Sequence, residues 1–415
     1  MKIHESLLPL ADEVQNSLTE VFRGFDRTAE INTCRVMEAF QEERVAEGCF
    51  AGTTGYGYDD LGRDTLDRIY ARVFGAEAAL VRLGLVNGTH ALTCALFGLL
   101  GPGDLLLSVT GAPYDTLRTA IGISGEAHGS LAFYGVRYAQ VELAADGGPD
   151  YEAVKEACTQ LKPRAVLIQR SRGYADRRAL TVHEIGELAK TVKEVSPSTA
   201  VMVDNCYGEF CETLEPTMVG ADLMAGSLIK NPGGGLAPAG GYIAGRKEYV
   251  ENASYRLTSP GVGGECGATF GQNRLLFQGF FMAPHVTAQA LKTAAFCAGM
   301  LERLGYDTSP GSDEVRPDII QMINLRTPEN LQRFCRGIQH GSPVDSYVSP
   351  EPWAMPGYDC EVIMAAGAFV QGSSIELSCD GPLREPYTAY LQGGITYESG
   401  KLGVLTALTE MLDGK

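Results

Sequence analysis

The stretch SLIKNPGGG, residues 227–235, places a lysine between an apolar run and three glycines, and VDNCYGEF, residues 203–210, places an aspartate at the end of another apolar run. A lysine at a strand end beside glycines can be desolvated and approached closely, and a buried carboxylate requires a cationic partner. Lys230 and Asp204 therefore match the needs of pyridoxal phosphate (PLP), an amine for a Schiff base and an acid for the pyridinium nitrogen. Taken singly, each residue favours a plainer interpretation. Lys230 would be a surface lysine at a turn, and Asp204 would be a helix N-cap.

A candidate phosphate site lies in NGTHA, residues 87–91, between an apolar run and the apolar stretch ALTCALFGLL. A strand, a glycine turn and a helix N-terminus form an anion site, because free N–H groups point outward and the helix dipole favours phosphate. Gly88 lets the backbone approach the phosphate, and the Thr89 hydroxyl can donate. Ser227, three residues before the lysine, can donate to the same phosphate. An ordinary turn between a strand and a helix is the alternative.

Apolar runs alternate with helical patterns between residues 79 and 229. This alternation is typical of an α/β protein whose mostly parallel sheet is covered by helices on both faces. Ligands in such sheets bind at the carboxyl ends of the strands. Asn87, Tyr114, Asp204 and Lys230 each follow or end a predicted strand, so we expect them to converge at that edge. The predicted strands are ALVRLGLV, DLLLSV, residues 131–134, RAVLIQ, AVMVD and ADLMAGSLI.

The rest of the chain divides around this region. Residues 1–50 have helical patterns, and a long helical region begins near Gly267 and is broken by Pro284. Beyond Gly305, mixed strand and helix patterns, among them DIIQMINL, EVIMAAGAFV, SSIELSC and SGKLGVLTALTEML, predict a small α+β domain. We therefore predict an N-terminal helical arm over 1–55, a large cofactor-binding domain over 56–285 and a small C-terminal domain over 286–415, connected by the long helix.

Composition narrows the function. The chain has 415 residues, enough for two sizeable cores, and a formal charge of −17 without a basic block, which argues against nucleic-acid binding. No apolar run reaches the roughly 20 residues of a membrane span, and the N-terminus lacks a secretory pattern. The 11 scattered cysteines, Cys206 and Cys211 among them, indicate reduced, mostly structural thiols in a cytoplasmic protein. The six histidines show no ligand spacing, so we expect no metal site.

The phosphate turn, an aromatic residue, the VDN aspartate and the S-x-x-K lysine come in an order that resembles the fold-type-I PLP enzymes, specifically the lyases of cysteine and methionine metabolism. A narrower resemblance is to the methionine gamma-lyase family, often labelled as cystathionine beta-lyase family proteins involved in aluminium resistance. Each motif is weak alone, but together and in order they are specific. They are GYGYDDLGRD, NGTHA, GAPYDTL, QRSRGY, SLIKNPGGGLAPAGGYIAG and SIELSCDGPLREPY, between residues 55 and 387.

The resemblance implies a carbon–sulfur lyase that acts on methionine, cystathionine or a relative by α-proton abstraction and β- or γ-elimination. Lys230 would hold the cofactor and then serve as the base, while Asp204 would keep the ring nitrogen protonated. Tyr114 would stack on the ring, although a core tyrosine is the alternative. The residues that would hold the phosphate are Gly88, Thr89, His90 and Ser227.

Tyr56 and Tyr58 resemble the tyrosine segment that, in the wider lyase group, reaches the phosphate of the neighbouring subunit. This resemblance implies a homodimer or a homotetramer with a site shared between subunits. A solvent-facing aromatic turn is the alternative. The glycine-rich segment SPGVGGECG, residues 259–267, could wrap a site or a neighbouring subunit.

The sequence departs from the wider lyase group at one position. That group carries an arginine directly before a Leu-Ser pair, where it grips the substrate carboxylate, whereas Glu376 stands at the matching position here. Arg384 and Arg172 are the candidate replacements, because a guanidinium binds a carboxylate through two hydrogen bonds. Surface ion pairing is the alternative for both.

Three functions stay open from the sequence. The first is the carbon–sulfur lyase, and the second is another PLP reaction, such as aldol cleavage or transamination, with the same lysine and aspartate. The third is a PLP-binding protein of stress or metal tolerance with little catalysis. Thiol and 2-oxo acid as products would support the lyase, whereas glycine and an aldehyde would support the aldolase.

Overall fold

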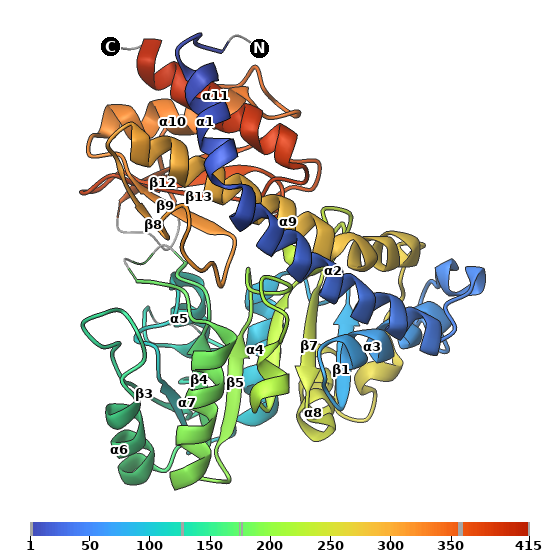
Figure 1. The fold of residues 1–415 in the computed structure, drawn as a ribbon. Helices are drawn as coiled ribbons and strands as arrows, with labels where there is room; N and C mark the ends of the chain where they lie inside the picture. Colours follow the sequence, from blue (N-terminus) through green and yellow to red (C-terminus); the bar gives the residue numbers. More distant parts are fainter. Residues whose placement is uncertain (1–2, 126–127, 174, 176, 356–359, 414–415) are drawn as a thin grey trace.

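The computed structural model describes residues 3–125, 128–173, 175, 177–355 and 360–413. Its larger sheet has seven strands in the order β1-β7-β6-β5-β4-β2-β3 (Figure 1). The pairs from β3 to β6 are parallel, and β7 runs antiparallel to both of its neighbours. The predicted α/β class with a mostly parallel sheet is therefore confirmed. The strands are β1 Ala78–Arg82, β2 Leu105–Ser108, β3 Arg137–Gln140, β4 Ala165–Gln169, β5 Ala200–Asp204, β6 Leu223–Ser227 and β7 Gly241–Gly245.

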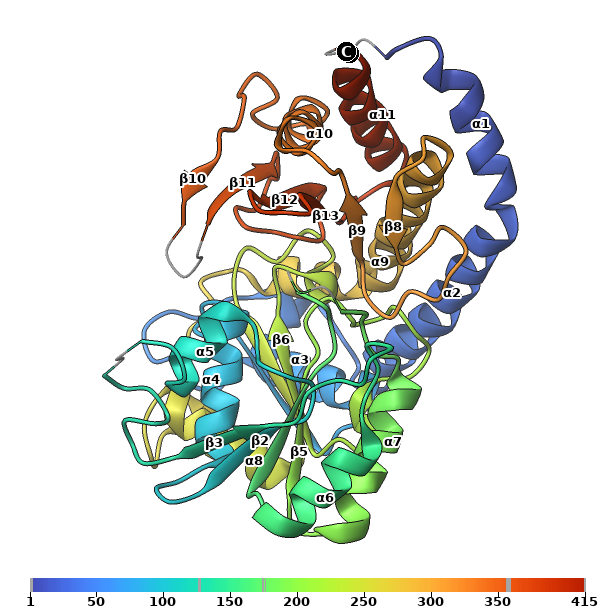
Figure 2. The ribbon, with the colours of Figure 1, turned by 90° about the vertical axis from the view of Figure 1, so that its left-hand side faces the viewer.

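Helices cover both faces of this sheet, as the parallel arrangement requires. One face packs against α2, α3, α6, α7 and the first half of α9, and the other packs against α4, α5 and α8 (Figures 1 and 2). Capping side chains set several helix starts, among them Asp60 at α3 and Thr181 at α7. The helices are α2 Thr19–Glu42, α3 Leu61–Val73, α4 Gly88–Leu99, α5 Asp115–Ile121, α6 Tyr151–Leu161, α7 Val182–Val195, α8 Lys247–Leu257 and α9 Asn273–Arg303, with short 3₁₀ turns η1 Glu47–Phe50, η2 Pro216–Val219, η3 Asn231–Gly233 and η4 Gly263–Glu265.

A second sheet of six strands, in the order β10-β11-β12-β13-β9-β8, is antiparallel throughout its described pairs. Its core is shared with α1, α10, α11 and the second half of α9. The division of the chain at residues 55 and 285 stays a prediction. The elements are α1 Leu7–Ser17, α10 Pro328–His340, α11 Tyr397–Asp413, β8 Asp307–Ser309, β9 Ile320–Asn324, β10 Trp353–Ala354, β11 Glu361–Ala366, β12 Ser378–Pro382 and β13 Thr388–Gln392.

Helix α9 joins the two cores, and its course corrects one prediction. Pro284 lies inside the helix, which runs unbroken for 31 residues, or roughly 46 Å. Proline removes one backbone hydrogen bond and costs about 3 kcal/mol in a helix interior. Burial outweighs that cost, because Phe280 packs in the core of the large sheet and Phe296 in the core of the second sheet. Figure 1 shows α9 crossing from one sheet to the other beside α2.

Three strand predictions were also wrong or incomplete. Residues 131–134 form turns, because Gly129 and Gly135 adopt positive φ on both sides, and the strand follows at β3. Strand β7 was not predicted, since its five glycine-rich residues carry little pattern of their own and are held by pairing on both edges. The strand expected in SSIELSC begins only at Ser378.

No helix among the described residues combines the length and the apolarity that a bilayer span needs.

Candidate active site

A cavity of about 380 Å³ lies between the two sheets. Tyr114, Asp204 and Lys230 line it from loops and strand ends at the carboxyl edge of the large sheet, and Pro382 and Tyr390 line it from the second sheet. Three of the residues that the sequence predicted to converge therefore do meet in one cavity. Their chemical roles stay a prediction.

Lys230 is held by a glycine-rich turn directly after β6. A side chain at position 233 would place its Cβ 1.7 Å from the carbonyl oxygen of Leu228, so the turn requires glycine there. The Lys230 ammonium lies 3.8 Å from the centre of the Tyr207 ring. Burial lowers the pKa of Lys230, but Cys206, Tyr207 and Asp204 oppose burial and leave the pKa above its ordinary value. Free Lys230 is therefore an ammonium at neutral pH.

Asp204 ends β5 and is 4% exposed. Its Oδ1 accepts a hydrogen bond of 3.1 Å from the backbone N–H of Cys206. Burial raises the pKa of Asp204, while Lys230 and this hydrogen bond favour the carboxylate. A buried acid of this kind gains stability from any cation in the cavity, such as a protonated ring nitrogen.

Gly88 and Ser227 lie side by side at the N-terminus of α4. A Cβ at position 88 would lie 3.3 Å from Cys206 Sγ and 3.4 Å from the Cβ of Ser227. The Ser227 hydroxyl is buried and has no hydrogen-bond partner among the described residues. Because the first N–H groups of a helix also lack intrahelical acceptors, this arrangement fits a phosphate group.

Thr89 and His90, the other two residues predicted at the phosphate, are both engaged with protein groups. The Thr89 hydroxyl lies 2.9 Å from the hydroxyl of Tyr114. His90 Nδ1 accepts from the backbone N–H of Val86 at 3.2 Å, and burial lowers the pKa of this imidazole. None of the residues at 88–90, nor Ser227, lines the cavity itself.

Tyr114 is fixed at both ends. Its backbone N–H donates to Gln169 Oε1 at 2.9 Å, and its hydroxyl meets Thr89. Burial and the negative charge of Asp204 raise the pKa of Tyr114. The ring therefore stays a neutral aromatic surface at the cavity wall.

The two candidate arginines differ in their partners. Arg172 is 1% exposed, and its guanidinium donates to Ser309 Oγ at 2.9 Å and interacts with the buried Asp318 carboxylate. Arg384, just beyond β12, is exposed, and among the described residues its guanidinium has no hydrogen-bond or ion-pair partner. Both line the cavity, but only Arg384 has an uncommitted guanidinium.

Glu376 does not face a substrate carboxylate in this structure. Its two carboxylate oxygens accept from the backbone N–H groups of Phe369 at 2.8 Å and Val370 at 2.9 Å. It is 3% exposed and absent from the cavity wall. Where the wider lyase group is expected to have a carboxylate-binding arginine, this chain therefore has a glutamate that holds a loop in place.

Tyr56 and Tyr58 lie outside the cavity. Their side chains are 72% and 55% exposed, and the two rings stack on each other with centres 5.5 Å apart. Within one chain they contribute nothing to the wall of the cavity. Their predicted role at a neighbouring subunit stays a prediction.

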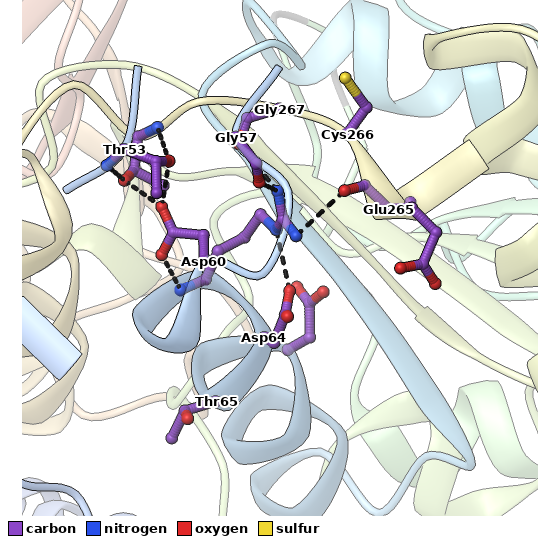
Figure 3. A network of polar contacts seen from close by, with 12 residues as sticks. Thr53, Gly57, Asp60, Asp64, Thr65, Glu265, Cys266 and Gly267 are labelled. Carbon is purple, nitrogen blue, oxygen red and sulfur yellow. Dashed lines mark hydrogen bonds and ion pairs between the residues drawn. The ribbon is translucent and has the colours of Figure 1, made fainter. Parts of the chain in front are cut away.

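Buried polar contacts hold this tyrosine turn in place (Figure 3). The Arg63 guanidinium, 2% exposed, donates to the carbonyl oxygens of Gly57, Gly267 at 3.0 Å and Glu265 at 3.3 Å. Asp60 adds a hydrogen bond from the Thr269 hydroxyl at 2.6 Å. The glycine-rich segment 259–267 is thus tied to the turn.

Several residues of the cavity wall had no assigned role in the sequence, among them Gln169, Tyr207 and Arg177. Cys206, which the sequence favoured as a structural thiol close to Asp204, also lines the wall. Tyr207 follows the aspartate closely and Gln169 ends a strand, so position alone could have suggested both. Arg177 lies eight residues beyond β4 and carries no such signal.

The fold is that of the fold-type-I PLP-dependent enzymes. The solved structure of the PLP-dependent protein YhfS from Escherichia coli shares the fold with a TM-score of 0.64 at 17% identity, over 93% of this chain and 96% of that chain. A family model described as methionine gamma-lyase matches residues 7–412. The chain belongs to the methionine gamma-lyase family, which confirms the resemblance stated from its motifs.

Two further comparisons extend over nearly the whole chain. It is 49% identical to the uncharacterized protein YnbB of Bacillus subtilis over 409 residues, 98% of this chain and 97% of that protein. The solved structure of a carbon–sulfur lyase involved in aluminum resistance from Clostridium novyi matches with a TM-score of 0.95 at 52% identity, over 98% of this chain and 96% of that chain. Family and neighbours indicate a PLP-dependent carbon–sulfur lyase-like protein.

Proposed function

We propose that this protein is a PLP-dependent lyase that removes the α-proton of a sulfur amino acid and expels its β- or γ-thiol group. The observation that carries the proposal is the presence of Lys230 and Asp204 in one cavity at the carboxyl edge of the sheet. Membership of the methionine gamma-lyase family supports the same reaction class. When bound, PLP supplies an electron sink for the negative charge that develops at the substrate α-carbon.

The residues of the cofactor end would each have a separate role. Lys230 would hold the cofactor and, once released from it, would accept the α-proton at Nζ. Asp204 would bind the ring nitrogen through a carboxylate that the Cys206 N–H orients. Tyr114 would support the ring, and Ser227 would donate to the phosphate together with the first N–H groups of α4.

We assign the substrate carboxylate to Arg384. Its guanidinium lines the cavity without a protein partner among the described residues, whereas Arg172 already interacts with Ser309 and Asp318. A free guanidinium can form two parallel hydrogen bonds to a carboxylate. Arg172 then serves the wall of the cavity.

We also infer that two or four copies assemble, with Tyr56 and Tyr58 of one copy reaching the site of the next. The turn that carries these two exposed rings is fixed by the buried Arg63, and this arrangement supports the inference. Exposed aromatic side chains that are held in place are typical of an interface. Light scattering on the purified protein tests the assembly, and a monomer at micromolar concentration would contradict it.

Product analysis tests the proposed reaction. The purified protein, supplied with PLP, is mixed with methionine, cystathionine and a panel of other amino acids. We expect a thiol and a 2-oxo acid in equal amounts from at least one sulfur amino acid. Glycine with an aldehyde, or an amino acid formed from an added 2-oxo acid, would assign a different PLP reaction. Cofactor binding without turnover of any amino acid would overturn the proposal.

A further inference from the structure

Arg177 lines the cavity, and its guanidinium has no carboxylate at ion-pair distance among the described residues. Its guanidinium donates to the carbonyl oxygens of Thr110 at 2.8 Å, of Gln169 at 2.9 Å and of Ser171. All three acceptors are neutral, and no carboxylate of the described residues lies within ion-pair distance. The Nε atom is buried without a partner.

The neighbouring Arg178 shows the contrast. Its guanidinium is paired with the Glu184 carboxylate, with one contact of 3.0 Å, at the start of α7. It does not line the cavity. The two consecutive arginines therefore differ electrostatically, since among the described residues Arg178 forms an ion pair and Arg177 forms none.

The acceptors of Arg177 place its guanidinium at the end of β4, the strand next to the one that Asp204 ends, and the Arg177 charge favours the Asp204 carboxylate. Gln169, whose carbonyl accepts from Arg177, stands directly opposite Asp204 in the register of β4 and β5. The Gln169 side chain also holds the backbone of Tyr114. Arg177 therefore contacts the strand end next to the aspartate and the residue that positions the ring-stacking tyrosine.

Arg177 keeps its charge under the conditions of catalysis. Burial lowers the pKa of Arg177 to about 10, with Asp204 and Asp318 opposing burial, so the guanidinium is charged at neutral pH. Lys230 differs, because its amine must be uncharged to bond the cofactor or to serve as a base. The ionisable groups around Arg177 and Asp204 are Lys230, Cys206, Tyr114, Arg172 and Asp318.

We propose that Arg177 is a positioning residue that supplies a permanent positive charge beside Asp204, which keeps this carboxylate ionised while the charge on Lys230 changes during turnover. The proposal rests on the proposed function, because it concerns the acid that faces the cofactor ring. It gives Arg177 no direct contact with the reacting atoms. Its effect is electrostatic and so reaches every ionisable group of the bound cofactor.

The test is a pH titration of the absorbance of bound PLP in the purified holoprotein. Removing a nearby cation makes protonation easier, so Arg177→Met is expected to move the titration midpoint upward by about one pH unit. Arg177→Lys keeps the charge and is expected to stay within about 0.3 unit of the unmodified protein. Arg178→Met is the matched control and is expected to leave the midpoint unchanged.

Each outcome of the titration decides between the possible roles. A midpoint in Arg177→Met equal to that of Arg178→Met would overturn the proposal. If Arg177→Met does not fold, Arg177→Gln takes its place, because it removes the charge and keeps a hydrogen-bond donor; an upward shift of about one pH unit supports the proposal, and a midpoint equal to that of Arg178→Met overturns it. A protein that shows no PLP absorbance at all refutes the proposed function instead, so the two failures are distinguishable.

Discussion

The cavity has two ends that are built differently. At the end formed by the large sheet, Asp204 is buried with its carboxylate oriented by a backbone N–H, and Lys230 lies against an aromatic ring. At the end formed by the second sheet, the Arg384 guanidinium is exposed and uncommitted. On the proposed function, contacts within the chain would organise the cofactor end, whereas the substrate end would gain its main contact from the substrate carboxylate.

This difference separates the expected effects of substitution. Changes at the cofactor end should lower kcat and cofactor retention, because those residues act in every turnover irrespective of substrate. Changes at the substrate end should raise KM and alter the choice of amino acid, because they remove binding without touching the electron sink. The two ends can thus be told apart by which kinetic constant moves.

Lys230→Ala is expected to have the largest effect. It removes both the anchor of the cofactor and the base, so turnover should fall by more than about 10³-fold. Borohydride reduction followed by peptide mapping should find the cofactor on Lys230 in the unmodified protein and on no residue in the variant. Lys190→Ala, on an exposed face of α7, is the control and should retain full activity. If Lys230→Ala turned over substrate at a near-normal rate, the proposed role of Lys230 would be wrong. The comparison of a cofactor end with a substrate end would then lose its basis.

Asp204→Asn is expected to rank second. The amide fills the same space but cannot hold a proton on the ring nitrogen, so kcat should fall by about 10²- to 10³-fold while part of the cofactor stays bound. Rates from single-turnover experiments and the PLP content after dialysis measure these two effects. Asp115→Asn, at another position on the cavity wall, controls for a change of charge there. A near-normal kcat would show that the ring nitrogen needs no acid.

The sequence predicted that Tyr114, Asp204 and Lys230 meet at the large-sheet end of the cavity, and they do. The turns that hold Lys230 and the α4 N-terminus are set by residues within a few positions, so each leaves a local pattern. The parallel sheet then brings these turns together at one edge, which the alternation of strands and helices predicted. Family-specific motifs added the substrate class on resemblance.

The remaining features depend on contacts that are distant in sequence. Helix α9 passes through Pro284 because two separate cores bury its flanks, and no local pattern contains that information. Arg177 is held at the cavity wall by hydrogen bonds to three carbonyl oxygens, which lie at or just beyond the ends of β2 and β4. The role of Glu376 emerges only from the loop that folds back on it. Composition and periodicity do not determine these pairings.

Arg384→Met is expected to act on the other end of the cavity. It should raise KM for the amino acid by about 10- to 100-fold with kcat changed by less than about threefold, since only ground-state binding of the carboxylate is lost. Arg384→Lys should restore part of the loss, because the charge returns without the two-pronged geometry. Initial rates against substrate concentration supply both constants. An unchanged KM would move the carboxylate site to another residue.

Arg172→Met separates the two candidate arginines. It removes the cation that most favours the buried Asp318 carboxylate, so a lower melting temperature is expected for this variant and not for Arg384→Met. A loss of stability together with a normal KM would confirm that Arg172 serves the wall.

Ser227→Ala is expected to have a smaller effect, confined to the cofactor. Its hydroxyl has no partner among the described residues, so the variant without PLP should be as stable as the unmodified protein. PLP should bind about 5- to 10-fold more weakly, because one hydrogen bond to a charged phosphate is lost. Ser378 is a matched control, since its hydroxyl is likewise buried without a partner but lies in β12. Equal PLP affinity in both alanine variants would place the phosphate elsewhere.

Glu209→Gln is expected to change activity least, by about twofold or less, and to act on stability. Glu209 is fully buried behind the cofactor end, where Oε1 accepts from the Tyr242 hydroxyl at 2.9 Å and Oε2 has no partner among the described residues. Burial raises the pKa of Glu209 to about 8, with the charge of Glu215 adding to the effect. The folded protein therefore favours the neutral acid, in contrast to the carboxylate required of Asp204.

The sign of the pH dependence follows from that raised pKa. Stability from neutral Glu209 is fully present below the ordinary pKa of about 4.5 and is lost as the pH rises through about 8. The melting temperature of the unmodified protein should thus fall by about 2–4 °C more between pH 6 and pH 9 than that of Glu209→Gln, which cannot ionise. Glu156→Gln, on the surface of α6, should follow the unmodified protein. Parallel curves for all three proteins would mean that Glu209 is already ionised when folded, and the base of the cofactor end would then hold a second buried charge beside Asp204.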